Sequence, residues 1–339
     1  MNPRTQAILI SGHGWEIPAF SAHDSLAEGL RAGPAAPHFT PERLLGRKGL
    51  RYKERSTLLA LCAASKALAD AGFVKADTVS LHDDGFGVVV ATNTCNLDTV
   101  CQAAETIHRQ HVNATSAMDL PNASSNVVSA AIAIRFGLRA LNLTVCTGAS
   151  SSLDAIVLAA NAIRNGRARR MVVVAVEVDG PAARSLLAGR RLAEGGGLPA
   201  LPEGAGALVL ERTDDANARG ARHHGALAGY AYCHADAARS PALDALLTDH
   251  ASKPCYVAGD SFAAHAVTAL HQREGAQRDL GILSGPAYGA GTLYALIHHC
   301  EQARAAEPES ARGAVVLGGG SWGDRRAGAI VIEAGGVGQ

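Results

Sequence analysis

Short apolar runs bounded by turn residues recur along the chain and alternate with helical patterns. Each run has the length of a short strand, and a continuously apolar strand is typical of a sheet that is buried on both faces. We therefore expect eight buried, largely parallel strands. They are Ala7–Ile10, Gly87–Ala91, Leu143–Cys146, Met171–Val176, Ala207–Leu210, Gly281–Leu283, Ala314–Leu317 and Ala329–Ile332.

Apolar positions three and four residues apart predict two amphipathic helices. The first spans Ser56–Ala71 and is followed by Gly72, a residue type that commonly ends helices. Its apolar face consists of Leu58, Leu61, Cys62, Ser65, Leu68 and Ala69. The second spans Ser150–Asn165 and is followed by Gly166. Its apolar face consists of Leu153, Ile156, Val157, Ala160 and Ile163.

One succession of elements occurs twice. The strand 143–146, a turn at 147–149, the helix 150–165 and the strand 171–176 are echoed by the strand 281–283, a turn at 284–286, a helix to about residue 303 and the strand 314–317. Such an echo indicates two halves that repeat one structural unit. We expect one domain over residues 1–339, with halves of approximately 1–212 and 213–339.

Composition narrows the class of protein. A hydrophobic share of 47% over 339 residues provides a large core, and an aromatic share of 4% with abundant Gly favours closely packed α/β layers. Lysine plus arginine and aspartate plus glutamate both number 31, so no basic field favours nucleic acid or an anionic membrane. The seven cysteines form no CxxC pair, and no apolar run reaches the length of a membrane span. We expect a reduced, cytoplasmic protein.

The turn Thr147-Gly148-Ala149, which enters the helix at Ser150, is the most informative site in the sequence. A sharp turn from strand to helix places its apical side chain at a helix N-terminus, where free N–H groups stabilise a thiolate or an oxyanion. A catalytic nucleophile would occupy this apex. Here the apical residue is Ala149.

The run Thr147-Gly148-Ala149-Ser150-Ser151-Ser152-Leu153 resembles the active-site elbow of β-ketoacyl synthases of the thiolase superfamily, whose pattern is Thr-Ala-Cys-Ser-Ser-Ser-Leu. The segments Ser11–Gly14, Arg55–Gly72 and Glu203–Ala207 also resemble that family. The resemblance implies an α/β, thiolase-like αβαβα layered fold built from two pseudo-repeated halves. It places Ala149 at the nucleophile position.

The resemblance also implies two catalytic histidines, whose N–H groups would serve decarboxylation and enolate stabilisation. Gly259 or Asp260 occupies the first of these positions, depending on a one-residue gap, and Pro286 occupies the second. With Ala149 at the elbow, the catalytic positions are degenerate. The chain is therefore similar to a chain length factor, the silent partner of an active ketosynthase in type II polyketide and aryl polyene systems. No catalytic residue, cofactor or metal is expected.

In such a subunit the strand that leads into the elbow, Asn142–Cys146, would be a sheet edge that pairs across a dimer axis. The segments Thr92–Thr106 and Met118–Val128 would reach the partner's acyl tunnel and limit product length. The implied partners are an active β-ketoacyl synthase and, through it, an acyl carrier protein. The expected tunnel and interface residues are Asn96, Leu97, Val100, Cys101, Asn122, Ser124, Ser125, Asn142 and Cys146.

Three alternatives remain open. One is an acyltransferase, cyclase or thioesterase with a relocated nucleophile, either Cys146, a serine of Ser150–Ser152 or Asp260. Another is a homodimeric binding or regulatory protein that kept the fold. A third is a silent partner of an alkylquinolone-type condensing enzyme. His265, His271, His298 and His299 lie on helical patterns without carboxylates at metal spacing, so no metal site is predicted among them.

Overall fold

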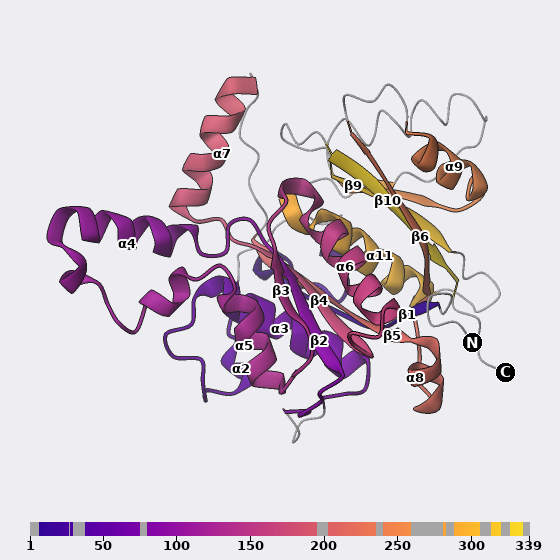
Figure 1. Cartoon of the computed structure of the whole chain (residues 1–339), viewed down its shortest axis with the longest axis horizontal. Coiled ribbons are helices and arrows are strands. Elements are labelled where there is room, and N and C mark those ends of the chain that lie inside the picture. The colour runs from indigo at the N-terminus through magenta and orange to yellow at the C-terminus, as the bar shows by residue number, and fades with distance from the viewer. Residues whose placement is uncertain are drawn as a thin grey trace.

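A ten-stranded mixed sheet runs through the computed structural model (Figure 1). The structure describes residues 7–26, 28–29, 38–74, 80–194, 203–234, 240–258, 281–282, 288–305, 313–319 and 326–334. Its strands are β1 (Ile8–Glu16), β2 (Phe86–Ala91), β3 (Asn142–Val145), β4 (Arg170–Glu177), β5 (Gly204–Arg212), β6 (Ala226–His234), β7 (Cys255–Ala258), β8 (Gly281–Ile282), β9 (Ala314–Gly319) and β10 (Arg326–Glu333). All eight predicted strands are present, and β6 and β7 were not predicted.

The strand order β3-β2-β4-β5-β1-β6-β10-β9-β7-β8 reads as two mirrored halves joined at β1 and β6. The repeated unit predicted from the sequence corresponds to β3-α6-β4 in the first half and β8-α11-β9 in the second. The expectation of largely parallel strands was wrong. Between described strands, four pairings are parallel and five are antiparallel, because β1, β5, β6 and β10 form an antiparallel centre.

The helices lie in three layers around the two half-sheets (Figure 1). They are α2 (Glu42–Leu45), α3 (Arg55–Asp70), α4 (Leu97–Gln110), α5 (Val127–Phe136), α6 (Ser151–Arg164), α7 (Pro181–Glu194), α8 (Thr213–Ala218), α9 (Pro241–Asp249) and α11 (Gly291–Ala305). Short 3-10 turns are η2 (Pro18–Phe20), η3 (Val112–Ala114), η4 (Leu120–Ala123), η5 (Gly148–Ser150) and η6 (Tyr288–Ala290). The three predicted helices are confirmed as α3, α6 and α11.

The alternation of side chains along each strand generates the layers. In β2, Val89 and Ala91 join the core around α6 and α11, whereas Val88 and Val90 join the core beneath α3. Successive side chains of a strand point to opposite faces, so each half-sheet is apolar on both sides. A third core lies between β6, β7, β9, β10 and α9. The resulting order is the αβαβα arrangement that the resemblance implied.

The predicted apolar face of α3 was too narrow. Leu59, Ala60, Ala63, Ala64 and Ala67 are also buried, because the helix packs on β1, β4 and β5 and is covered by α5. Gly12 and Gly14 of β1 permit this packing. A β-carbon on either glycine would overlap the backbone of Ala67. Small residues on both elements therefore bring α3 directly onto the sheet.

Candidate functional site

The predicted strand, turn and helix of the elbow are confirmed. β3 ends at Val145, and η5 leads directly into α6. Gly148 has a φ of 68°, in the left-handed region where a residue without a β-carbon is least strained. Ala149 is 3% exposed, so its methyl group is buried at the entrance to α6.

Asn93, in the turn after β2, binds both backbone groups of the elbow glycine. Its Oδ1 accepts from the amide of Gly148 at 2.9 Å, and its Nδ2 donates to the carbonyl oxygen of Gly148 at 3.1 Å. Ser151 Oγ lies 3.2 Å from the same Oδ1. One side chain therefore fixes the orientation of the peptide groups on either side of Gly148.

Glu177, at the end of β4, positions Asn93 in turn. The carboxylate is fully buried and accepts hydrogen bonds from Asn93 Nδ2 at 2.7 Å, Asn93 N at 3.1 Å, Thr94 N at 3.0 Å and Thr94 Oγ1 at 2.7 Å. Burial raises the pKa of Glu177, and these hydrogen bonds oppose that rise. The carboxylate thus organises the 93–94 turn against the elbow.

The second half of the chain contributes Gly289, in η6, to the same site. A β-carbon at this position would overlap Asn93 Nδ2 and approach Glu177 Oε1 to 2.5 Å. Only a glycine fits here while Asn93 keeps its contacts with the elbow. The sequence signal for this group of residues was weak, although Glu177 stands out as a charge that ends the apolar run of β4.

Asp154 connects the elbow to the second half-sheet. Its carboxylate accepts from Thr147 Oγ1 at 2.7 Å, Tyr232 OH at 2.8 Å and Arg326 Nη1 at 3.0 Å. The guanidinium of Arg326 also lies over the ring of Tyr232, 4.1 Å from its centroid. Asp154 is buried, so this network joins α6 to β6 and β10 inside the molecule.

Of the candidate relocated nucleophiles, Asp260 lies outside the described residues, and Cys146, Ser150 and Ser151 are in unfavourable states for nucleophilic attack. Cys146 is exposed at the surface. Its thiol is nevertheless partly desolvated and lies near Glu177, and both effects raise the pKa of the thiol and disfavour the thiolate. Ser150 Oγ donates to the carbonyl of Arg326 at 3.0 Å, and Ser151 Oγ donates to that of Gly148 at 2.8 Å. These two hydroxyls therefore serve the packing of α6. Ser152 Oγ is buried without a hydrogen-bond partner.

Three of the four degenerate positions, Gly259, Asp260 and Pro286, lie outside the described residues. His265 and His271 lie outside them as well. Ala149 is therefore the one degenerate position whose surroundings the structure gives.

β3 lies at one end of the sheet, as expected for an edge strand. The carbonyls of Leu141 and Val145 accept from Val88 N at 2.8 Å and Thr92 N at 3.0 Å, so these residues direct their backbone groups toward β2. The intervening Asn142 and Thr144 direct theirs away from it. Asn142 is exposed, and its side of the strand is open to pairing.

The two predicted interface segments meet in the structure. Asn96 Nδ2, before α4, donates to the carbonyl of Ala123 in η4 at 2.9 Å. Ser124 and Ser125 are exposed beyond it. Asn122 differs from the expectation of an interface residue, since it is buried and its amide donates to the carbonyl of Tyr52 at 2.9 Å. It anchors η4 to the loop before α3.

α4 extends from the body of the molecule beside α7 (Figure 1), and it has no buried residue. Its apolar side chains follow one helical line, which we call the α4 stripe, composed of Leu97, Val100, Cys101, Ala104 and Ile107. Val100 is 40% and Ile107 is 43% exposed. Met118 and Leu120, in the segment that follows, are exposed as well. This apolar surface has no covering element among the described residues.

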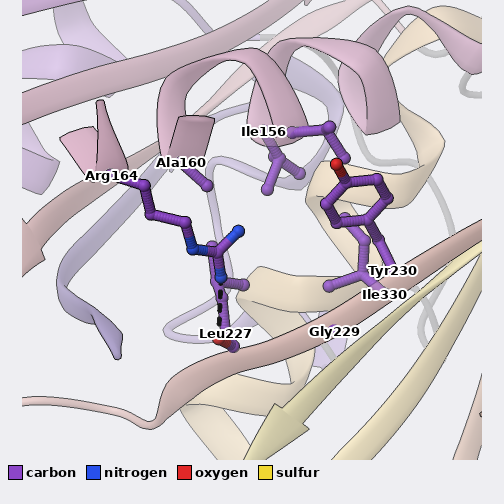
Figure 2. Close-up of a pocket in the computed structure, with 8 residues that line it drawn as sticks. Ile156, Ala160, Arg164, Leu227, Gly229, Tyr230 and Ile330 are labelled. Atoms are coloured by element: carbon purple, nitrogen blue, oxygen red, sulfur yellow. Dashed lines mark hydrogen bonds between the residues drawn. The ribbon is translucent and has the colours of Figure 1, made fainter. Parts of the chain in front are cut away.

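A shallow pocket, open to solvent, lies between α6 and the strands β6 and β10 (Figure 2). It is lined by Ile156, Val157, Ala160, Arg164, Leu227, Gly229, Tyr230 and Ile330. Arg164 Nη2 donates to the carbonyl of Leu227 at 3.4 Å. The pocket lies along the C-terminal half of α6, whereas the elbow is at the N-terminus of that helix. It is therefore distinct from the elbow.

Residues 45–191 match the family model of the β-ketoacyl synthase N-terminal domain. This range contains the elbow, Asn93 and Glu177. Among curated proteins, 3-oxoacyl-[acyl-carrier-protein] synthase 2 of Synechocystis sp. is 26% identical over 231 residues, which cover 63% of this chain and 54% of that protein. The chain spans about half the length of the curated relatives it matches.

Solved ketosynthase structures align with nearly the whole chain. The ishigamide ketosynthase/chain length factor superposes with a TM-score of 0.77 and 22% identity, over 97% of this chain and 100% of that chain. The AntDE:AntF complex, a type II PKS acyl-carrier protein with its ketosynthase bound to the hexaketide, superposes with a TM-score of 0.77 and 15% identity, over 97% of this chain and 99% of that chain.

None of the described helices combines the length and the apolar character required to cross a bilayer. The predicted α/β class and layered architecture are confirmed by the sheet, by its helices and by the superpositions. Residues 45–191 are thus similar to the N-terminal domain of β-ketoacyl synthases, and the chain has the fold of the solved ketosynthase structures.

Proposed function

We propose that this chain is a non-catalytic ketosynthase-like subunit of the chain length factor type, which pairs with an active β-ketoacyl synthase and shapes its acyl tunnel. The observation that carries the proposal is Ala149, whose buried methyl group occupies the elbow apex. Acyl transfer through a covalent intermediate requires a nucleophile at that point. The sequence also lacks a histidine at Gly259, Asp260 and Pro286.

The contacts around the elbow support a structural role for it. Asn93, Glu177 and Gly289 hold the turn in one geometry although its side chain cannot accept an acyl group. Burying a carboxylate costs free energy, so we infer that the Glu177 network is kept because it holds the elbow in one conformation. This conformation fixes the position of the end of β3 and of the outward-facing segments that follow β2.

The open side of β3 and the α4 stripe form the surface that we assign to the partner. β3 offers unpaired backbone groups at Asn142 and Thr144, and the stripe offers apolar side chains beside the 118–125 segment. Main-chain pairing supplies register, and apolar burial of about 25 cal/mol per Å² supplies stability. An active ketosynthase would provide a matching edge strand, and side chains of the stripe would then limit the depth of its tunnel.

Acylation of the isolated chain tests its catalytic silence. The purified protein is incubated with acetyl-CoA or malonyl-CoA and its intact mass is measured, with a cysteine-bearing ketosynthase of known activity as the positive control. We expect no mass increase on this chain. If this chain became acylated and then turned the acyl group over, the proposal would be wrong.

Pairing is tested by co-expressing the chain with each cysteine-bearing ketosynthase encoded in the same genome and measuring the mass of the co-purified species. We expect a one-to-one complex with one of them. The double variant V100D and I107D places charges on the α4 stripe and should weaken the complex at least tenfold. Q102D, on the polar side of the same helix, is the matched control and should leave it unchanged. The proposal would be contradicted if the chain formed a stable homodimer and bound none of the co-expressed ketosynthases.

A further inference from the structure

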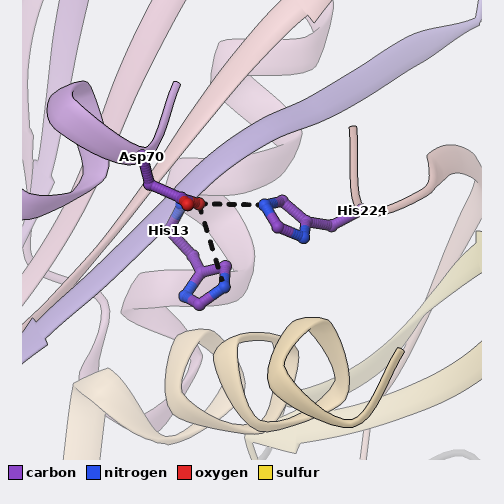
Figure 3. Close-up of side chains that lie close together, drawn as sticks. All are labelled: His13, Asp70 and His224. Atoms are coloured by element: carbon purple, nitrogen blue, oxygen red, sulfur yellow. Dashed lines mark hydrogen bonds and ion pairs between the residues drawn. The ribbon is translucent and has the colours of Figure 1, made fainter. Parts of the chain in front are cut away.

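Three side chains with metal-ligating atoms meet where the two half-sheets join (Figure 3). His13 comes from β1, Asp70 from the last turn of α3, and His224 from the loop before β6. His224 Nε2 lies 2.9 Å and His13 Nε2 lies 3.9 Å from Asp70 Oδ2. The three ligand atoms all lie within 4.8 Å of one another. This cluster belongs neither to the elbow nor to the proposed partner surface.

His13 is the unusual member of the cluster. Its side chain is nine-tenths buried, yet neither ring nitrogen has a hydrogen-bond partner. The ring packs edge-on against that of His224, with centroids 4.6 Å apart, and its Nε2 lies on the side of Asp70. A buried polar atom without a partner costs about 1–3 kcal/mol. A ligand that accepts the lone pair of Nε2 would remove this cost.

The donor set selects a class of ligand. Two imidazoles and one carboxylate are typical ligands of Zn²⁺, and ligands of a tetrahedral zinc ion, bound at about 2.0–2.1 Å, lie roughly 3.3 Å apart. The 2.9 Å and 3.9 Å separations bracket that value. Burial and the neighbouring His224 lower the pKa of His13 to about 4, so this ring is neutral at pH 7, as a metal ligand must be.

We propose that His13 Nε2, the Asp70 carboxylate and His224 Nε2 bind one divalent transition-metal ion of the Zn²⁺ class. The ion lies between His224 Nε2 and Asp70, which are in hydrogen-bond contact without it. Any proton on Nε2 is released to water or replaced by one on Nδ1, and water completes the coordination of the ion. It connects β1, the end of α3 and the loop before β6. Its role is structural, because it links three segments that meet at the junction of the half-sheets.

Arg304 modulates this site. Its Nη1 lies 3.2 Å from Asp70 Oδ1, while the other carboxylate oxygen faces the two histidines. The guanidinium repels a dication and competes for the carboxylate. Its side chain is 55% exposed, so it can turn toward solvent when a metal ion binds. Removing this charge should therefore strengthen metal binding.

Zinc binding is measured on the full chain by isothermal titration calorimetry with ZnCl₂, after treatment with a chelator. We expect one equivalent to bind with a Kd in the micromolar range. Arg304→Gln should tighten binding at least threefold, a gain that misfolding cannot produce. His224→Ala and His13→Ala should each weaken binding at least tenfold.

His250→Ala is the matched control, because His250 Nδ1 also lies near a carboxylate, 3.8 Å from Glu333 Oε1, outside the cluster. This variant should bind zinc like the parent chain. The proposal is overturned by an absence of saturable binding up to 100 µM ZnCl₂. It is equally overturned if His224→Ala and His250→Ala change the Kd alike, or if Arg304→Gln weakens binding.

Discussion

Glu177 is the residue on which the geometry of the elbow depends most directly. Both of its oxygens accept hydrogen bonds, from Asn93 and Thr94, and it is fully buried. Glu177→Gln would turn an NH₂ group toward these donors. We expect a loss of about 2–3 kcal/mol in the free energy of unfolding, measured by urea denaturation. Glu105→Gln, on the exposed side of α4, should change it by less than about 0.5 kcal/mol.

Glu54, immediately before α3, predicts a dependence of stability on pH. Burial and the nearby carboxylates of Asp98 and Asp119 raise the pKa of Glu54 from 4.5 to about 7. The folded state therefore binds this proton more tightly than the unfolded state, so stability falls as pH rises from about 4.5 to 7 and levels off above. Glu54 is partly exposed, so we expect about 1 kcal/mol of change.

The measurement for Glu54 is urea unfolding at pH 5 and pH 8. Glu54→Gln should flatten the difference between the two pH values by raising stability at pH 8. Glu105→Gln serves again as the control and should keep the slope of the parent chain. An unchanged slope in Glu54→Gln would show that other groups produce the pH dependence.

At the residue scale, the sequence predicted the alanine at the apex of the elbow but not the residues that hold the elbow in place. Ala149 was found because a short, ordered pattern surrounds it, and the structure places it at the expected turn. Asn93, Glu177 and Gly289 come from three distant segments, and their roles exist only through contacts across the sheet. No local pattern encodes such contacts. The contact between Asn122 and the backbone of Tyr52 was not foreseen for the same reason.

At the scale of elements, α4 differs from a core helix such as α6 in having its side chains exposed or half-buried. It has no buried residue, and Asp98 Oδ1, which accepts from Ala182 N at 2.7 Å, ties it to α7. We expect amide hydrogens of α4 to exchange rapidly in the isolated chain and to become protected in a complex with a ketosynthase. Hydrogen-exchange mass spectrometry measures this, with the buried α6 as the slow reference in both states. Equal protection of α4 in both states would contradict its assignment to the interface.

Apolar runs located the strands, but their pairing direction could not be read from them. A run such as Met171–Val176 is buried on both faces whether its neighbour is parallel, like β2, or antiparallel, like β5. β6 was missed because exposed and buried positions alternate irregularly along it. The single apolar faces predicted for α3 and α6 were too narrow, since both helices are covered on several sides.

At the scale of the whole molecule, the two halves depend on contacts through the central layer. Asp154 of α6 binds Tyr232 and Arg326 of the second half-sheet. Asp154→Ala would remove the acceptor of Tyr232 OH and Arg326 Nη1. Arg326 is 38% exposed and partly screened by solvent, so we expect a loss of about 1–2 kcal/mol, measured by urea denaturation. Asp179→Ala, which removes an ion pair with the fully exposed Arg184, should have a clearly smaller effect. Similar losses in both variants would contradict the coupling.

The strand order also limits how large an assembly can grow. A sheet that ends in two equally long, open strands could add subunits at both ends and extend into a filament. Here the four-residue β3 forms the edge that we assign to the partner. Pairing across β3 uses up this edge in both partners at once. An assembly built through β3 therefore closes as a pair.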